Sequence, residues 1–265
     1  MDLRPAPQRV LQISDSHLGG RPGETLLGLD TDESLQDVLQ RLRQREQHAD
    51  YVVATGDISS NGQMAAYERF LRSMESGYGR PLAWLAGNHD RDQSMCTFPR
   101  ERVARELVEL DHWQLILLNS SLPGHEHGLI GDQELQRLEQ QLQGCDKHAL
   151  VFVHHQPVLV GSRWIDQYVI RNAGALLGLL SRYPHVRALC WGHVHQDFSS
   201  RWGHFGLYSA PSTCIQFKPR CDDFALDTAM PGYRWFDLHA NGELQTGVER
   251  TAEKSYAIDF ASGGY

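Results

Sequence analysis

The strongest constraint on the fold is a repeated pattern, in which a short apolar run is followed, directly or after one glycine, by Asp, Asn or His residues. The runs are five or six residues long and rich in Val, Ile, Leu and Ala, as in strands that are buried on both faces. Amphipathic segments separate them, and this alternation is typical of an α/β protein with parallel strands. The runs cover residues 9–14, 51–55, 82–86, 149–153 and 186–191.

The segments between the runs predict the helices. In residues 31–47, Leu35, Val38, Leu39 and Leu42 recur with helical spacing, and we expect Thr31 or Asp32 to cap this helix. Similar reasoning predicts a further strand at 113–119 and short strands at 206–210, 212–217, 233–238 and 243–249, with helices at 64–74, 101–110, 132–142 and 172–183. Because no repeat or linker interrupts the pattern, we expect a single domain over residues 1–265.

Composition narrows the possible partners and the compartment. The chain has 265 residues and a formal charge of -8, which argues against nucleic acid as a partner. No apolar run approaches the roughly 20 residues that span a membrane, and the first 15 residues lack the apolar core of a signal peptide. The five cysteines are odd in number and have no C-x-x-C spacing. We therefore expect a cytoplasmic protein with reduced thiols and no membrane partner.

The polar residues after the runs predict a metal centre. Because parallel strands bring their carboxyl ends to one edge of a sheet, residues from distant parts of the chain can meet there. Oxygen and imidazole donors without a thiolate suit Mn²⁺, Fe²⁺ or Zn²⁺. The candidates are Asp15, His17, Asp57, Asn88, His89, Asp90, His154, His155, His193 and His195.

The number of donors exceeds the needs of one ion. Seven ligands, one of them a bridging carboxylate, would serve two divalent ions with four protein ligands each. Asp57 stands alone after a glycine and suits the bridge, whereas either His154 or His155 could be a ligand. On an extended chain, residues two apart point to the same side, so each pair in Asp-x-His and His-x-His can face the site.

The motifs also carry a family resemblance. "SDSH", "GD", "GNHD", "HH" and "GHVH" resemble, in order and spacing, the signature of the calcineurin-like metallophosphoesterases. Stretches such as "WIDQYVIRNAG" and "PGYRWFDLHANG" resemble, along nearly the whole chain, the bacterial 3′,5′-cyclic-AMP phosphodiesterases of that superfamily. The resemblance implies a four-layer α/β/β/α sandwich with a strand-rich C-terminal part. It also implies a dinuclear site of Fe²⁺ or Mn²⁺, with Zn²⁺ as an alternative. The implied activity is hydrolysis of cyclic AMP to 5′-AMP by a metal-bound hydroxide, which would lower cellular cyclic AMP.

The same resemblance assigns roles to individual residues. It places Asp15, His17, Asp57 and His195 on one metal, and Asp57, Asn88, His154 and His193 on the other. The first histidine of the pair is the ligand in the family pattern. His89 is then the residue that donates a proton or hydrogen bond to the phosphate or the leaving oxygen, and Asp90 either orients its neighbours or forms a turn. The substrate-binding residues implied are His17, Asp57, Asn88, His89, His195, Arg171, Asn172, Thr213 and Gln216.

The sequence can also be compared with other branches of the superfamily and with other possible functions. Purple acid phosphatases have a metal-binding tyrosine where this chain has Ser60, so a ferric–tyrosinate site is not expected. A phosphodiesterase for another small diester, such as a glycerophosphodiester, shares the same metal site. A catalytically dead scaffold would have lost ligands or the histidine after Asn88, and this chain retains them all. The metal in the cell, selectivity between cyclic AMP and cyclic GMP, and oligomeric state are left open.

Overall fold

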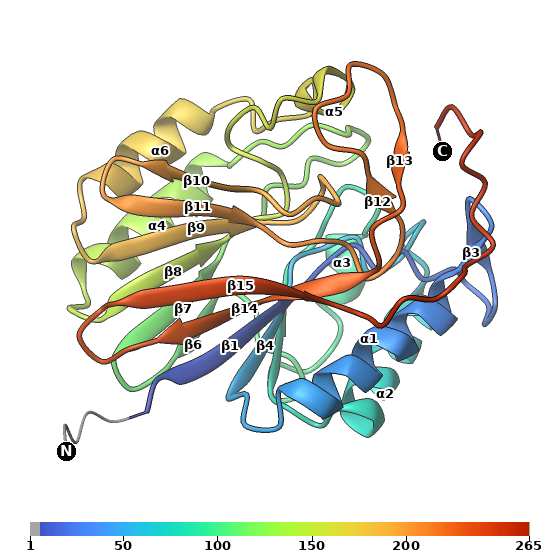
Figure 1. Ribbon diagram of the computed structural model, residues 1–265. Helices are drawn as coiled ribbons and strands as arrows, with labels where there is room; N and C mark the ends of the chain where they lie inside the picture. The colour runs from blue at the N-terminus through green and yellow to red at the C-terminus, as the bar shows by residue number, and fades with distance from the viewer. Residues whose placement is uncertain (1–5, 265) are drawn as a thin grey trace.

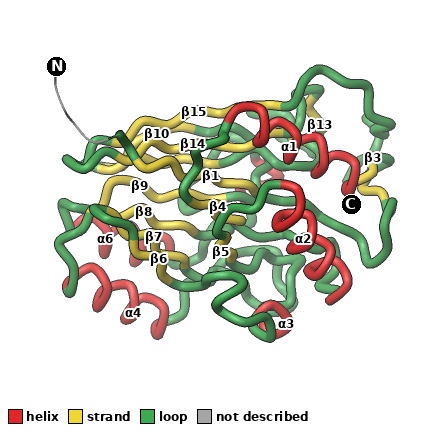
Figure 2. The backbone as a smooth tube through the Cα atoms, turned by 90° about the horizontal axis from the view of Figure 1, so that it is seen from below, coloured by secondary structure: helices red, strands yellow, loops and turns green. Residues whose placement is uncertain are grey.

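Two stacked sheets form the centre of the molecule in a computed structural model that describes residues 6–264. The first sheet has the strand order β15-β14-β1-β4-β5 and the second β10-β11-β9-β8-β7-β6. Helices α1 and α2 lie apart from α4 and α6, with the strands between them (Figure 1, Figure 2). The helices are α1 (Thr31–Arg45), α2 (Met64–Gly77), α3 (Asp92–Met95), α4 (Asp132–Gln143), α5 (Arg163–Asp166) and α6 (Ala173–Ser181).

The strands fall on every predicted strand segment, although only residues 216–217 of the segment 212–217 form one, and they include five that were not predicted, at 25–26, 29–30, 107–109, 199–202 and 226–227. They are β1 (Gln8–Ile13), β2 (Thr25–Leu26), β3 (Leu29–Asp30), β4 (Tyr51–Ala54), β5 (Leu82–Trp84), β6 (Leu107–Glu109), β7 (Trp113–Leu117), β8 (His148–Phe152), β9 (Val186–Trp191), β10 (Ser199–Trp202), β11 (Phe205–Ser209), β12 (Gln216–Phe217), β13 (Leu226–Asp227), β14 (Gly232–Leu238) and β15 (Leu244–Arg250). β2 pairs with β3, and β12 with β13, as small hairpins outside the two main sheets.

Three apolar clusters show why the molecule has four layers. Successive side chains of a strand point to opposite faces, so Leu11 and Ile13 of β1 pack under α1 and α2, whereas Val10 faces the second sheet. A third cluster joins the second sheet to α4 and α6. Both faces of the central strands are therefore buried, which explains their unbroken apolar runs. The expected four-layer α/β/β/α sandwich is confirmed.

Parallel pairing brings the strand ends together. β1, β4 and β5 are parallel neighbours in the first sheet, and β7, β8, β9 and β11 are parallel neighbours in the second. The C-terminal strand β14 runs antiparallel to β1 on its other side and pairs with β15. After Ser199 the described residues contain strands and no helix, as expected. The prediction of one domain over residues 1–265 stays a prediction.

Two local predictions are wrong. Helix α1 is capped not by Thr31 or Asp32 but by Asp30, whose carboxylate accepts a hydrogen bond from the backbone N–H of Glu33 at 3.0 Å. The segment 101–110 is not a helix, because residues 107–109 form β6, which pairs antiparallel with β7 and buries Val108. Glu106 has a φ of 71°, which an α-helix does not accommodate.

Two further observations concern the cysteines and the membrane. The cysteines, all of which lie in residues 6–264, are free thiols, as expected. Within the same residues, every helix is too short or too polar to cross a lipid bilayer.

Candidate metal centre

The backbone turns sharply at the candidate ligands. Left-handed φ values, which are uncommon outside glycine, occur at Asp15 (56°), His17 (46°), Asp57 (49°), His193 (63°) and His195 (46°). Such conformations cost free energy and cluster at functional sites. The sequence reasoning that placed Asp-x-His and His-x-His on extended chain is therefore wrong in its geometry. The side chains still converge, because each loop turns back over the strand ends.

Glycines before the ligands allow these loops to approach one another. A Cβ atom on Gly87 would lie 2.1 Å from the Oδ1 of Asp57 and 2.5 Å from its backbone nitrogen. Gly56 has a φ of 96°, and a Cβ there would lie 2.5 Å from the Nδ1 of His154. The glycines of "GD" and "GNHD" are thus required by close packing of the β4 and β5 loops against the ligand side chains.

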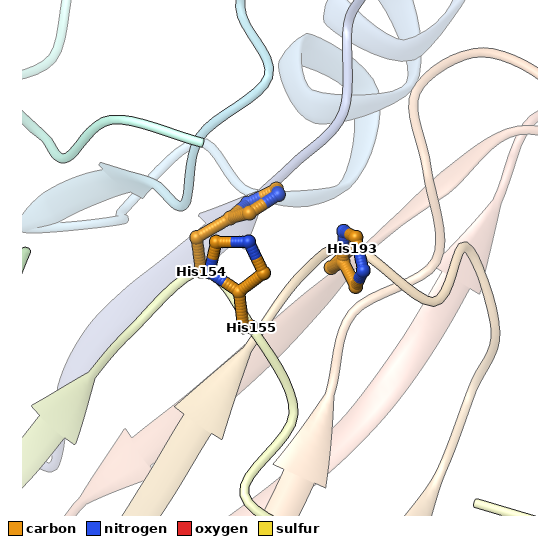
Figure 3. A group of neighbouring side chains, drawn as sticks. All are labelled: His154, His155 and His193. Carbon is orange, nitrogen blue, oxygen red and sulfur yellow. The ribbon is translucent and has the colours of Figure 1, made fainter. Parts of the chain in front are cut away.

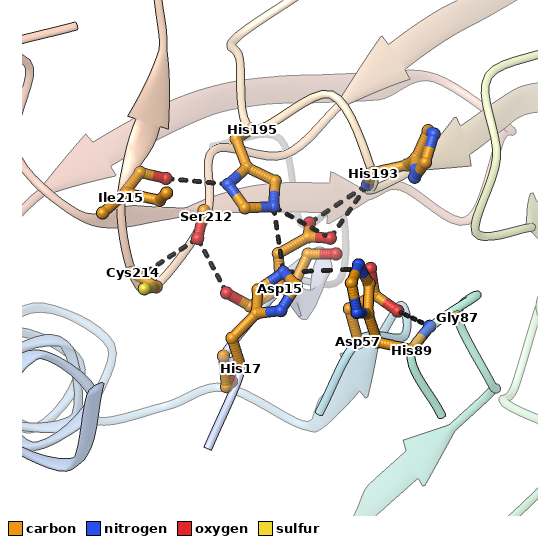
Figure 4. Close-up of polar contacts among 12 residues, drawn as sticks. Asp15, His17, Asp57, Gly87, His89, His193, His195, Ser212, Cys214 and Ile215 are labelled. Atoms are coloured by element: carbon orange, nitrogen blue, oxygen red, sulfur yellow. Dashed lines mark hydrogen bonds and ion pairs between the residues drawn. The ribbon is translucent and has the colours of Figure 1, made fainter. Parts of the chain in front are cut away.

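Two buried carboxylates form the middle of the cluster (Figure 4). Asp15 and Asp57 are 0% and 2% exposed. The Nε2 of His195 lies 3.5 Å from Asp15, and the Nε2 of His154 lies 3.2 Å from Asp57. The Nε2 atoms of His17 and His195 are 3.2 Å apart, and that of His17 is 3.8 Å from Asp57. Four loops from both sheets therefore meet at these two acids.

Hydrogen bonds to backbone carbonyls orient two of the imidazoles. The Nδ1 of His154 lies 2.7 Å from the Thr55 carbonyl, and the Nδ1 of His195 lies 2.9 Å from the Ile215 carbonyl. Because a carbonyl only accepts hydrogen bonds, Nδ1 carries the proton in both rings. Each Nε2 then faces a carboxylate, where a bound metal could take the place of a proton, and this is how metal-ligating histidines are usually oriented.

The electrostatics favour a bound cation. Burial raises the pKa of Asp57, but His154 and neighbouring histidines outweigh burial and hold that pKa well below its usual value. Burial lowers the pKa of His17 to about 3 and that of His193 well below its usual value. The Nε2 of His193 is buried without a hydrogen-bond partner among the described residues. Charged carboxylates beside neutral imidazoles fit a divalent metal.

The seven expected ligands lie in one cluster. In one group of three residues, Asp15, His17 and His195, the ligand atoms all lie within 4.8 Å of one another. A second such group, Asp15, Asp57 and His154, shares Asp15 with the first. Another group joins His154, His155 and His193 at the ends of β8 and β9 (Figure 3). The Oδ1 of Asn88 lies 3.1 Å from the Nε2 of His154.

His89 lies at the edge of this cluster, with a ring nitrogen within 4.8 Å of ligand atoms of His17 and Asp57. Its backbone N–H donates to the Oδ1 of Asp57 at 2.9 Å, and its ring centroid is 5.0 Å from that of His17. The ring Nδ1 is 3.1 Å from the carbonyl of Ser60. The residue is half-buried, so its ring borders both the cluster and solvent.

Asp90 holds two loops together. Its carboxylate accepts hydrogen bonds from the backbone N–H groups of Gly87 (2.9 Å), Ile58 (3.2 Å) and Ser59 (3.0 Å). Burial, assisted by the charge of Asp57, raises the pKa of Asp90 to about 6. Its role is to orient neighbouring backbone, which was one of the two interpretations of this residue.

Ser120 distinguishes the two adjacent histidines and was missed by the sequence reasoning. Its Oγ accepts from the backbone N–H groups of His154 (3.3 Å) and His155 (3.2 Å) and lies 2.8 Å from the Nδ1 of His155. His154 therefore faces Asp57, whereas His155 contacts Ser120 on the β7 loop. The sequence signal was the polar "NSS" at residues 119–121, which begins on the last residue of the predicted strand at 113–119.

Of the four residues expected to form a nucleotide pocket, three have side chains that are hydrogen-bonded to other protein groups, and the fourth is exposed. Thr213 is buried and hydrogen-bonded to Ser16, and the amide of Gln216 donates to two backbone carbonyls. The amide of Asn172 donates to and accepts from the backbone of Ile130, and Arg171 is exposed. Their part in substrate binding stays a prediction.

Comparison with known proteins gives consistent results. The family profile described as calcineurin-like phosphoesterase matches residues 8–197. The chain is 40% identical to the 3′,5′-cyclic adenosine monophosphate phosphodiesterase CpdA of Pseudomonas aeruginosa, covering 97% of this chain and 94% of that protein. It is 43% identical to the protein of the same name from Vibrio vulnificus, covering 97% and 95% of the two chains.

Solved structures share the fold at low sequence identity. A dimetal phosphatase from Danio rerio aligns with a TM-score of 0.61 and 15% identity, covering 94% of this chain and all of that one. A purple acid phosphatase from Lupinus luteus aligns with a TM-score of 0.67 and 14% identity, covering 96% of this chain and 54% of that one. These similarities concern the fold alone.

Proposed function

Because the chain belongs to the calcineurin-like phosphoesterase family and is a metal-dependent phosphodiesterase, we propose that it hydrolyses 3′,5′-cyclic AMP to 5′-AMP at a dinuclear centre. The observation that carries this proposal is the buried Asp15–Asp57–histidine cluster, in a chain about 40% identical to named cyclic-AMP phosphodiesterases. Acting in the cytoplasm, the enzyme would lower the concentration of cyclic AMP.

The ligand set divides into two groups that share Asp57. Asp15, His17, Asp57 and His195 would hold one ion, and Asp57, Asn88, His154 and His193 the other. Two divalent ions, either Fe²⁺ or Mn²⁺ with Zn²⁺ as an alternative, bring four positive charges against the two carboxylates. The surplus supplies local positive charge for an anionic substrate in a chain whose formal charge is -8.

His154 is the better choice of ligand from the histidine pair. The Thr55 carbonyl holds a proton on Nδ1, so that Nε2, which points at Asp57 and Asn88, is the atom that would give up its proton to a metal. In His155, Nδ1 is instead paired with Ser120, whose oxygen already accepts two backbone N–H groups and so has its own proton left to donate. Such an arrangement places the proton of His155 on Nε2, where it blocks coordination.

The protein's own residues would orient the substrate and provide a proton. When bound, the two ions would polarise the phosphoryl oxygens and lower the pKa of a water molecule. His89, held by its backbone N–H to Asp57 and its ring to Ser60, borders the cluster from the solvent side. Because its Nδ1 faces the Ser60 carbonyl, Nε2 is the nitrogen that would act on the substrate. We infer that the doubly protonated ring donates from Nε2 a hydrogen bond to the phosphoryl group, or a proton to the departing 3′ oxygen.

A substrate panel tests this function. The metal-reconstituted protein should convert 3′,5′-cyclic AMP to 5′-AMP, and a chelator should stop turnover. Cyclic GMP and a glycerophosphodiester serve as comparison substrates. Formation of 3′-AMP as the main product, or turnover of the glycerophosphodiester alone, would overturn the assignment.

A further inference from the structure

Three aromatic side chains form a small apolar surface next to the metal centre. Phe217 ends β12, Phe224 lies in the loop between β12 and β13, and Trp164 is in α5. Their rings meet edge to face, with centroids 4.9 Å apart for Trp164 and Phe217, 5.0 Å for Trp164 and Phe224, and 5.5 Å for Phe217 and Phe224. We refer to these three residues as the aromatic wall.

The aromatic wall is in direct contact with a candidate ligand. The ring of Phe217 stacks on that of His195 with centroids 4.1 Å apart and an interplanar angle of 5°. The other face of the site, around His17 and His89, is polar. The wall thus begins one side chain away from the position where a phosphate would bind.

The wall lies at the edge of the sandwich core. Phe217 and Phe224 belong to a fourth cluster with Leu29, Ile215, Leu226 and parts of the C-terminal segment, and Trp164 joins this cluster to the one beneath α4 and α6. Trp164 and Phe224 are only half-buried. In Figure 1, α5, β12 and β13 stand beyond the carboxyl ends of the central strands, where ligands bind in open α/β sheets.

We propose that the aromatic wall binds the base of the nucleotide, with Phe224 as the residue that stacks on it. This inference rests on the proposed function and extends it to substrate selection. The metal centre would act on the phosphate group that all phosphodiesters share, so selection among diesters needs contacts elsewhere. A ribose separates phosphate from base, and the half-buried ring of Phe224, one aromatic side chain beyond the Phe217 that stacks on His195, offers the base a surface of matching chemistry. Stacking of a base on an aromatic side chain is a strong and geometry-dependent contact.

Binding of two product-like ligands to the metal-loaded protein tests the proposal. 5′-AMP carries the base, whereas ribose 5-phosphate has the same phosphate and sugar without it. Titration calorimetry should show that the wild-type protein prefers 5′-AMP. Phe224→Ala should weaken 5′-AMP binding by about 5- to 150-fold and leave ribose 5-phosphate unchanged. Phe224→Tyr should retain the preference for 5′-AMP.

Two further variants keep the test decisive. Phe224→Leu preserves apolar bulk and folding but not stacking, so it should resemble Phe224→Ala. Phe260→Ala removes another phenyl group that is 51% exposed and outside the wall, and it should bind both ligands like the wild type. Equal losses for both ligands in Phe224→Ala, or full 5′-AMP binding by Phe224→Leu, would overturn the proposal. Because binding is measured without turnover, failure to hydrolyse cyclic AMP would count against the proposed function alone.

Discussion

At the scale of single residues, the site is recognisable in the sequence because each ligand motif comes directly after a buried apolar run. The order "SDSH", "GD", "GNHD", "HH" and "GHVH" therefore predicts which side chains meet. What sequence does not reveal is the surroundings of a side chain. Thr213 and Gln216 are candidates by resemblance alone, and only the structure reveals that both are buried with partners in the protein. Ser120 contacts the histidine pair from a loop whose only sequence signal is the polar "NSS".

The bridge is tested by Asp57→Asn. The amide keeps the shape and can still accept the hydrogen bond from His89, but it removes the charge that both ions would share. We expect elemental analysis to find fewer than two metals per chain and turnover to be abolished. Asp222→Asn changes an exposed carboxylate and should keep two metals. Two metals per chain in Asp57→Asn would refute the bridge.

His89 is tested by substitution with alanine. We expect both metals to stay, because the ring is not in the proposed ligand set, while kcat for cyclic AMP falls about 10²- to 10⁴-fold. If His89 protonates the leaving oxygen, bis-p-nitrophenyl phosphate should lose less activity, because its leaving group needs less protonation. Equal losses on the two substrates would indicate charge stabilisation instead. Metal loss in this variant, or unchanged kcat, would show that the role is wrong.

At the scale of elements, strands and helices with strong periodicity are correctly predicted, whereas the segment 101–110 is not. The spacing of its charged and apolar residues fits a helix. The segment instead contains strand β6, which pairs with β7, and the left-handed backbone of Glu106 is incompatible with a helix. Short hairpins such as β12–β13 leave almost no periodic signal. The loops at the strand ends are held by glycines whose packing only the structure reveals.

The contact between the β4 and β5 loops is tested by Gly87→Ala. The added methyl group would overlap the carboxylate and backbone of Asp57, so the two loops must separate. We expect the free energy of unfolding to fall by about 1–3 kcal/mol, together with weaker metal binding. In α6, Gly178 has open space around its Cβ, and Gly178→Ala should raise stability by about 1 kcal/mol. Urea denaturation would compare them, and equal stability of Gly87→Ala and the wild type would contradict the packing argument.

At the scale of the whole molecule, the metal centre joins the two sheets, because its ligands come from loops of both. This arrangement has a thermodynamic consequence in the metal-free protein. Burial holds the pKa of His17, His155 and His193 far below that of an unfolded histidine, which is about 6.5. As the pH falls below that value, the unfolded chain takes up protons at these residues that the folded chain does not.

The metal-free protein should therefore lose stability between pH 7 and pH 5. Each proton of difference is worth about 1.4 kcal/mol per pH unit. Asp90, whose pKa is raised to about 6, opposes the effect with one proton below that pH. His154, whose pKa is raised to about 9, opposes it only near pH 7, because below about pH 6.5 this histidine is protonated in the unfolded chain as well. Urea unfolding in the presence of a chelator would measure the change. Stability that is equal or greater at pH 5 would contradict the account.

The most direct measurement of the central claim is anomalous X-ray scattering from crystals of the manganese-loaded protein. We predict two peaks about 3.5–4 Å apart. They should lie on either side of Asp57, one beside Asp15, His17 and His195, the other beside Asn88, His154 and His193. A single peak, or a second ion bound by His155 in place of His154, would contradict the account.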